Sequence, residues 1–178
     1  GIGAYLLWQR IKSLRTPIKM TSIFVLITIL TINVVSFLHI YFVNYPYEKS
    51  QYIQYPFKQV AQFAWSQYDN VDLIVFDPLF GGDAPFVATA TQYYLAYFGN
   101  YPPSKFQEQY RIGNKERETI FDKFSIRKIN WGEDQNLKNT LFIGNSWSLP
   151  IDKIDKDKII KVFYYYNNRP AFYAIKLN

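Results

Sequence analysis

The sequence predicts an α/β protein made of one transmembrane helix followed by an open, mixed α/β sheet domain with a C-terminal antiparallel hairpin. The first observation behind this prediction is an uncharged apolar run over residues 20–43. The second is the order of patterns after it, which reads helix, strand, helix and then several strands. The third is a pair of strand-like segments at the end of the chain, separated by the turn residues 167–170.

The apolar run Met20–Val43 contains no Lys, Arg, Asp or Glu. A helix of this length rises about 36 Å, which is enough to cross a hydrocarbon core of about 30 Å. The alternative is the buried core helix of a soluble protein, but such helices rarely run so far without a charged face. A signal peptide does not fit, because the run is too long and no small-residue cleavage site follows it.

The positive charge of the chain is concentrated before this helix. The net charge is +6, and residues 1–43 hold four basic and no acidic side chains, so the 16 basic and 14 acidic residues after them contribute only +2. The positive-inside rule therefore places residues 10–19 in the cytoplasm and residues 44–178 outside it. Because the basic excess is juxtamembrane, we expect a lipid bilayer and no nucleic acid as a partner.

Residues 1–19 are expected to be the end of a preceding membrane helix and a basic cytoplasmic loop. Gly1–Trp8 is apolar and leads into a short basic loop over Arg10–Lys19, within which Pro17 suits the start of the next helix. The chain also begins with Gly. We therefore expect a C-terminal fragment of a larger, multi-pass membrane protein, whose missing N-terminal membrane region is a partner of this part.

The residue inventory excludes several kinds of chemistry. The chain has no cysteine, so thiol catalysis and cysteine metal sites are excluded. Its one histidine, His39, rules out a histidine zinc cluster and a histidine-based catalytic triad. His39 lies near the outer end of the apolar run, where an interfacial structural role is expected. No cofactor is expected.

The first half of the outer domain reads as helices around one strand. Residues 44–55 are expected to be an aromatic linker, with the domain proper over residues 56–178. Apolar residues at helical spacing predict an amphipathic helix over Pro56–Tyr68, and the continuous apolar run Leu73–Phe76 predicts a central strand covered on both faces. We expect a second helix from Pro85 to Phe98, ended by Gly99, and a third over 102–110.

The second half reads as strands. After a charged loop over 111–118, we expect a strand over Phe121–Trp131 with a bulge near Arg127 and Lys128. A short buried strand follows at Thr140–Ile143. A charged turn, residues 152–158, leads to the closing hairpin formed by residues 159–166 and 171–177.

The loop Asp77–Ala84 is the best candidate for a ligand site. Ligands of open α/β sheets bind at the carboxyl ends of strands, and this loop follows the predicted central strand. Gly81 and Gly82 would let the backbone approach a ligand, and Asp77 and Asp83 could accept hydrogen bonds or bind a cation. The alternative is a turn in which Asp83 caps the helix expected from Pro85.

Three further groups have a competing structural explanation, and none receives a catalytic or metal-binding assignment. Asp155 and Asp157 resemble the paired aspartates that hold a divalent metal in soluble nucleotide-sugar transferases, but their lysine neighbours indicate a solvated turn. The tyrosines of residues 164–166 could stack on sugars or pack as a strand. Glu133 and Asp134 are adjacent carboxylates, and sequence neighbours point apart too readily to form an acid–base pair.

The chain resembles the C-terminal end of bacterial integral-membrane glycosyltransferases of the protein O-mannosyltransferase-like class, within the GT-C superfamily and similar to glycosyltransferase family 39. The resemblance extends over the full chain. It consists of the order of the predicted elements and of short similar sequence segments, and not of an invariant motif. The segments that carry it are Met20–Val43, Asn44–Pro46, Lys58–Phe76, Tyr93–Gln107, Lys138–Gly144 and Arg169–Ile175.

This resemblance implies a parent enzyme that transfers a sugar from a polyprenyl-phosphate carrier to an extracytoplasmic glycan or protein acceptor, with inversion. It also implies that the catalytic carboxylates lie in a first outer loop near the amino terminus, outside this sequence. The outer domain would then be an accessory, non-catalytic part that covers the catalytic region or helps bind the acceptor. The alternative is a membrane-anchored binding or scaffold domain without enzymatic activity.

Overall fold

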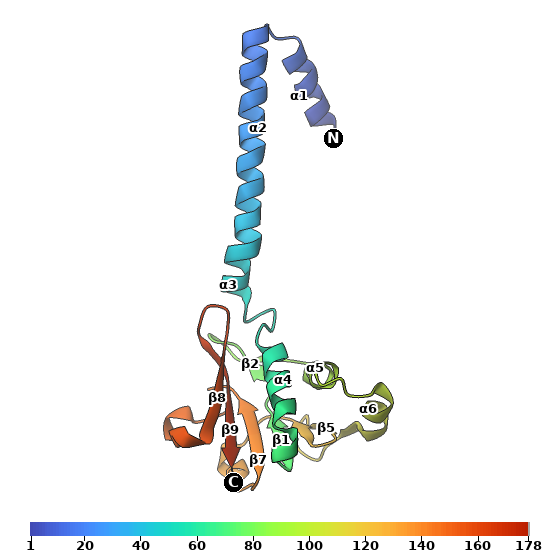
Figure 1. Ribbon diagram of the computed structural model, residues 1–178, viewed down its shortest axis with the longest axis vertical. Helices are drawn as coiled ribbons and strands as arrows, with labels where there is room; N and C mark the ends of the chain where they lie inside the picture. Colours follow the sequence, from blue (N-terminus) through green and yellow to red (C-terminus); the bar gives the residue numbers. More distant parts are fainter. Residues whose placement is uncertain (178) are drawn as a thin grey trace. The chain divides into compact units, whose positions relative to one another are not determined.

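The computed structural model describes residues 1–177, and these form two compact units that are described separately. The first unit is Gly1–Tyr47 and the second begins at Glu48. Figure 1 shows the two helices of the first unit and the mixed sheet with its helices in the second.

The first unit contains α1 (Ile2–Lys12) and α2 (Thr16–His39). Without a break, α2 continues through one π-helical stretch, η1 (Ile40–Asn44), into α3 (Tyr45–Lys49). Among the described residues, one helix is long and apolar enough to span a membrane: the continuous run of 34 residues from Thr16 to Lys49, which contains an 18-residue stretch with a mean hydropathy of 2.4. None of the α2 side chains is buried within the protein.

Two uncharged polar side chains in the middle of α2 form hydrogen bonds within the helix itself. The Thr28 hydroxyl donates to the Phe24 carbonyl at 3.0 Å, and the Asn33 amide donates to the Ile29 carbonyl at 2.8 Å. Such bonds to the preceding turn allow a polar side chain to lie in an apolar environment without an unpaired donor.

The basic loop is shorter than the sequence predicted. We expected a loop over Arg10–Lys19, but α1 continues to Lys12 and α2 already begins at Thr16. Ser13 follows the last residue of α1, and its hydroxyl donates back to the Arg10 carbonyl at 2.8 Å. The segment predicted as a linker, residues 44–55, is also partly helical, since α3 extends to Lys49.

The second unit is built on a seven-stranded mixed sheet in the order β4-β5-β6-β1-β7-β9-β8. Its parallel centre is β1 (Leu73–Phe76) between β6 (Phe124–Ile126) and β7 (Thr140–Gly144). The antiparallel strands are β4 (Arg111–Ile112), β5 (Thr119–Phe121), β8 (Ile159–Tyr164) and β9 (Pro170–Leu177). The α/β class, the central position of Leu73–Phe76 and the C-terminal edge hairpin are therefore confirmed.

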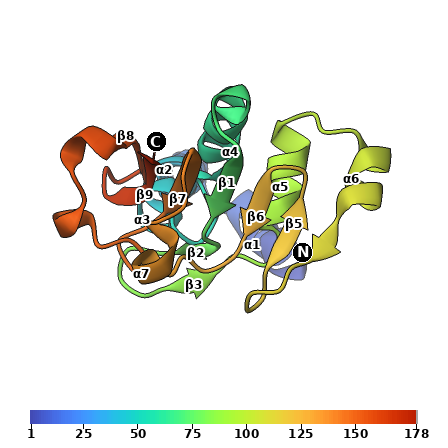
Figure 2. The same ribbon diagram turned by 90° about the horizontal axis from the view of Figure 1, so that it is seen from below.

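The helices and turns of the second unit are short. The α-helices are α4 (Phe57–Ser66), α5 (Thr91–Phe98), α6 (Pro103–Gln109) and α7 (Trp131–Asp134). The 3₁₀ turns are η2 (Tyr68–Asn70), η3 (Ile151–Lys153) and η4 (Lys156–Lys158). A separate two-stranded hairpin consists of β2 (Leu79–Phe80) and β3 (Phe86–Val87), visible beside the main sheet in Figure 2.

The sheet separates two apolar layers because side chains alternate along each strand. Ile74 and Phe76 of β1 belong to the larger cluster, together with the buried face of α4 and with Leu95 of α5. Val75 points the other way and packs in a second cluster with Phe142. The continuous apolar run of β1 thus reflects burial on both faces, as its sequence predicted.

Two predicted elements are wrong. Pro85 does not open a helix, because Phe86 and Val87 pair with β2 and α5 begins only at Thr91. Residues 121–131 are not one bulged strand: Phe121 ends β5, the chain turns back at Asp122, whose φ is +49°, and β6 ends at Ile126, before α7 begins at Trp131.

Tertiary hydrogen bonds explain this unexpected turn. The Asp122 carboxylate accepts the hydroxyl of Tyr68 at 2.6 Å and that of Tyr101 at 2.9 Å. Both tyrosines come from segments far away in the sequence, so a local pattern could not reveal the turn.

Candidate functional site

Polar side chains gather where the three parallel strands end. Asp77 follows β1, Arg127 follows β6 and Asn145 follows β7, and all three are buried. Because β6 and β7 lie on opposite sides of β1, this edge is the kind of switch point at which open α/β sheets bind ligands.

Asp77 uses both carboxylate oxygens to hold loops together. One oxygen accepts the Leu79 backbone N–H at 2.8 Å, and the other accepts the Ile129 backbone N–H at 2.9 Å. Burial raises the pKa of Asp77, and these two hydrogen bonds partly oppose that rise. Asp77 therefore joins the loop after β1 to the loop after β6, which is a structural role.

A crevice of about 490 Å³ opens beside Asp77. Its walls come from the segment after β1, the start of α5 and the loops around β5 and β6. Leu79, Ala88 and Ile126 contribute apolar surface. The polar and charged side chains that line the crevice are Asp77, Thr89, Gln92, Glu116, Arg117, Thr119, Arg127 and Lys128.

Gln92 is the polar side chain of this crevice best suited to contact a ligand. It lines the crevice from the first turn of α5 and is only 9% exposed. Arg117 and Lys128 add two positive charges to the lining. An amide that can donate and accept, next to two cations and apolar surface, suits a ligand with hydroxyl groups and a negative charge.

A buried ion-pair network supports one wall of the crevice. Arg127, 3% exposed, binds Asp134, 1% exposed, through two parallel hydrogen bonds of 2.7 Å each. Glu118 lies 3.5 Å from the Arg127 Nε and accepts the Ser125 hydroxyl at 2.5 Å. Lys115 reaches Asp134 from the surface at 3.2 Å.

The two cations of this network, Arg127 and Lys115, balance its two carboxylates and affect their pKa values. Burial by itself raises the pKa of Asp134, but the hydrogen bonds from Arg127, the Asn130 N–H and Lys115 outweigh it and hold the pKa below the ordinary value. For Glu118, the Ser125 hydroxyl, the Lys115 N–H and the Arg127 charge likewise outweigh burial and lower the pKa. Both carboxylates are therefore ionised and paired at neutral pH.

The other three predicted site residues lie apart from the crevice, at the tip between β2 and β3. The Gly81 N–H donates to the Tyr165 hydroxyl at 2.7 Å, and the Gly81 carbonyl accepts the Trp147 Nε1–H at 2.9 Å. The Gly82 N–H donates to the Gln51 side chain at 3.0 Å. The predicted cluster thus divides into Asp77 at the crevice and a glycine tip that contacts other loops.

Asp83 does not cap a helix, because no helix begins at Pro85. Its carboxylate pairs with Arg169 at 2.8 Å on the surface, and this pairing lowers the pKa of Asp83. The alternative that the sequence left open, a turn, is correct for this segment, but the capping role is not.

The two glycines allow a matched test of this geometry. Gly81 has a φ of +112°, and a Cβ there would lie 2.1 Å from the Ala84 carbonyl oxygen, so Gly81→Ala is expected to destabilise the domain by ~1–3 kcal/mol. In Gly82→Ala the new Cβ would meet only the flexible Arg169 side chain, at 3.2 Å, and the change should stay within about 0.5 kcal/mol. Denaturant unfolding of the full chain in detergent micelles measures both, and equal effects would contradict the assigned backbone geometry.

The remaining candidates have structural roles or surface positions. Asp155 forms an exposed ion pair with Lys158 at 3.1 Å, and no group of three potential ligand side chains for a metal occurs in residues 1–177. Tyr165 is buried, whereas Tyr164 and Tyr166 are exposed. Sequence reasoning missed Gln92 and the Arg127–Asp134 pair, because their roles depend on contacts between separate segments.

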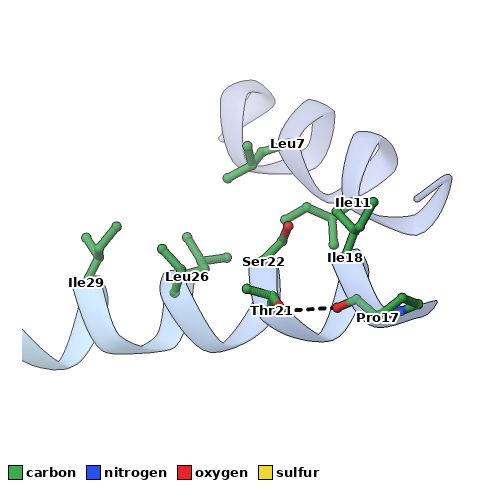
Figure 3. A pocket seen from close by; sticks show the side chains of 9 residues that line it. Leu7, Ile11, Pro17, Ile18, Thr21, Ser22, Leu26 and Ile29 are labelled. Atoms are coloured by element: carbon green, nitrogen blue, oxygen red, sulfur yellow. Dashed lines mark hydrogen bonds between the residues drawn. The ribbon is translucent and has the colours of Figure 1, made fainter. Parts of the chain in front are cut away.

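The first unit has a groove of about 610 Å³ between α1 and α2, shown in Figure 3. Leu7 and Ile11 of α1 face Ile18 and Ser22 of α2 across it. Its Thr21 hydroxyl donates to the Pro17 carbonyl at 3.1 Å. A groove lined almost wholly by aliphatic side chains within a membrane-spanning length suits lipid or helix packing better than recognition of a polar ligand.

Fold and site together define the class of this protein: a mixed α/β domain with a switch-point crevice, joined to a helix of membrane-spanning length and hydropathy. No family model, curated protein or solved structure matches the chain.

Proposed function

We propose that this chain is the C-terminal part of a multi-pass membrane glycosyltransferase of the protein O-mannosyltransferase-like class. The parent enzyme would transfer a sugar from a polyprenyl-phosphate carrier to an extracytoplasmic acceptor. Residues 44–178 would lie outside the cytoplasm, which the four basic and no acidic residues of the first 43 positions support. The choice of this enzyme class rests on the sequence segments that resemble it, which run from Met20–Val43 to Arg169–Ile175.

In this proposal the outer domain binds the acceptor and does not carry out the transfer. The observation that carries this division is the crevice beside Asp77, where Gln92, Arg117 and Lys128 are free to contact a ligand. Sugar hydroxyls suit the amide, and an acidic group on the acceptor suits the two cations.

The carboxylates at this edge support a binding role. An inverting transfer needs a carboxylate positioned to take a proton from the acceptor. Asp77, Glu118 and Asp134 are buried, and hydrogen bonds to backbone or side-chain donors occupy each of them. Glu116, the other acidic residue of the crevice lining, is exposed on a loop.

The test uses the complete reading frame in membranes, with radiolabelled polyprenyl-phosphate mannose as donor and membrane-extracted glycan as acceptor. Gln92→Leu keeps the side-chain volume and removes the amide, so the KM for the acceptor should rise severalfold while the KM for the donor stays unchanged. Lys128→Ala should act in the same direction. Asn136→Ala, on an exposed loop before β7, serves as the control and should change neither constant.

Two outcomes would contradict the proposal. Unchanged acceptor KM in both crevice variants would remove the crevice from acceptor binding. A complete reading frame without further membrane spans and without transfer would instead favour the alternative, a membrane-anchored binding or scaffold domain.

A further inference from the structure

Five exposed aromatic side chains form a band that the proposed function does not use. We call this band the aromatic rim. All of its members are between about two-fifths and about half exposed, and they are Tyr52, Tyr55, Phe86, Trp147 and Tyr166.

The rim comes from four segments that meet around Gly81. Tyr52 packs on Phe86 with ring centroids 5.5 Å apart, and a Cβ on Gly81 would touch the Phe86 ring. Gly81 also accepts the Trp147 indole N–H and donates to the hydroxyl of Tyr165. Tyr166, next to Tyr165, contacts Tyr55 edge-on at 5.6 Å.

The rim lies at the carboxyl edge of the parallel strands. Trp147 follows β7, whose Gly144 pairs with Tyr173 near the start of β9, so the turn between β8 and β9 reaches the same edge. In Figure 1, β2 and the turn between β8 and β9 lie at one end of the second unit. The segment before α4, which carries Tyr52 and Tyr55, belongs to that end through its ring contacts.

The length of the chain keeps this edge close to the end of the membrane-length helix. If residues 20–43 cross the hydrocarbon core, the helical residues 44–49 add about 9 Å, which carries the chain through the headgroup layer. The helix ends at Lys49, and Tyr52 and Tyr55 follow after three and six residues. At no more than about 3.6 Å per residue, they stay within about 11 Å and about 22 Å of that point.

We propose that the aromatic rim rests on the headgroup layer of the bilayer in which the helix is inserted. Tyrosine and tryptophan rings settle at this depth because each has an apolar body and a polar tip. Lys49, whose ammonium lies 5.5 Å from the centre of the Tyr52 ring, supplies a positive charge for lipid phosphates. The edge that carries the crevice then faces the membrane surface, whether or not the parent protein is a glycosyltransferase.

The full chain tests this directly because it has no native cysteine. Tyr166→Cys is labelled with an environment-sensitive fluorophore, and the chain is reconstituted into phosphatidylcholine–phosphatidylglycerol vesicles with or without lipids that carry a headgroup-level spin label. Position 166 lies in the turn between β8 and β9, so its quenching reports how closely the rim approaches the headgroup layer. We expect a blue-shifted emission and strong quenching.

Lys138→Cys is the matched control, since Lys138 is exposed just before β7, at the opposite edge of the sheet. Its label should emit as in water and be quenched severalfold less than the label at 166. Equal quenching at the two positions would overturn the proposal. A water-like, unquenched label at 166 would also overturn it, and would instead point to a protein as the occupant of the rim.

Discussion

Replacement of Arg127 by methionine is expected to destabilise the outer domain by about 3–5 kcal/mol. Methionine fills much of the arginine volume but removes the two 2.7 Å hydrogen bonds from Arg127 to the Asp134 carboxylate, which is 1% exposed. The Asn130 N–H and the half-exposed Lys115 remain as partners, but the buried positive charge is lost, and a buried charge that loses its main partner is strongly destabilising. Chemical unfolding of the full chain in detergent micelles, followed by tryptophan fluorescence, measures the loss.

Two further measurements separate loss of the ion pair from loss of packing. The double variant Arg127→Met/Asp134→Leu removes both charges and should recover most of the lost stability. The pairing contributes stability above the unfolded pKa of about 3.9 and loses it as the pH falls through the lowered pKa of Asp134. The difference between wild type and Arg127→Met should therefore shrink below about pH 4, and a pH-independent difference would contradict the ion-pair explanation.

Phe57→Ala is expected to cost about 3–5 kcal/mol, mostly through the cavity it leaves. The Phe57 ring is almost fully buried at the start of α4 and contacts four aromatic rings with centroids between 5.3 and 5.9 Å. Those rings belong to Phe76, Phe80, Tyr94 and Phe172. The side chain thus connects α4 to β1, to the β2 strand, to α5 and to β9.

Tyr97→Ala is the control for this prediction. Tyr97 is 76% exposed on α5, so removing its ring should change stability by no more than about 0.5 kcal/mol. The same unfolding experiment compares the two variants. A similar loss in both would mean that Phe57 is not part of the core.

Periodicity and length made several elements predictable. The apolar run from Met20 and the helical spacing from Phe57 each depend on neighbouring residues alone, and both segments form helices. The run Leu73–Phe76 has only apolar side chains, which fits burial on both faces and so a central strand.

The candidate site was only partly predictable. Its location, the carboxyl end of β1, followed from a general rule about open sheets, and the crevice does lie there. Its residues did not follow, because Gln92 enters the crevice from α5 and Arg117 and Lys128 enter from loops around β5 and β6. A glycine pair drew attention to the loop, yet those glycines contact Gln51, Trp147 and Tyr165 instead of the crevice.

By itself, the sequence determined the membrane-length helix, the α/β class and the closing hairpin, because each depends on side-chain patterns within one continuous segment. Only the tertiary structure decided that Asp77 is committed to the Ile129 N–H, 52 residues away, and that Arg127 is committed to Asp134. It also decided that Asp122 turns the chain between β5 and β6, since tyrosines from two other segments hold its carboxylate. Hydrogen bonds between distant residues depend on how the segments pack, and no local pattern records that packing.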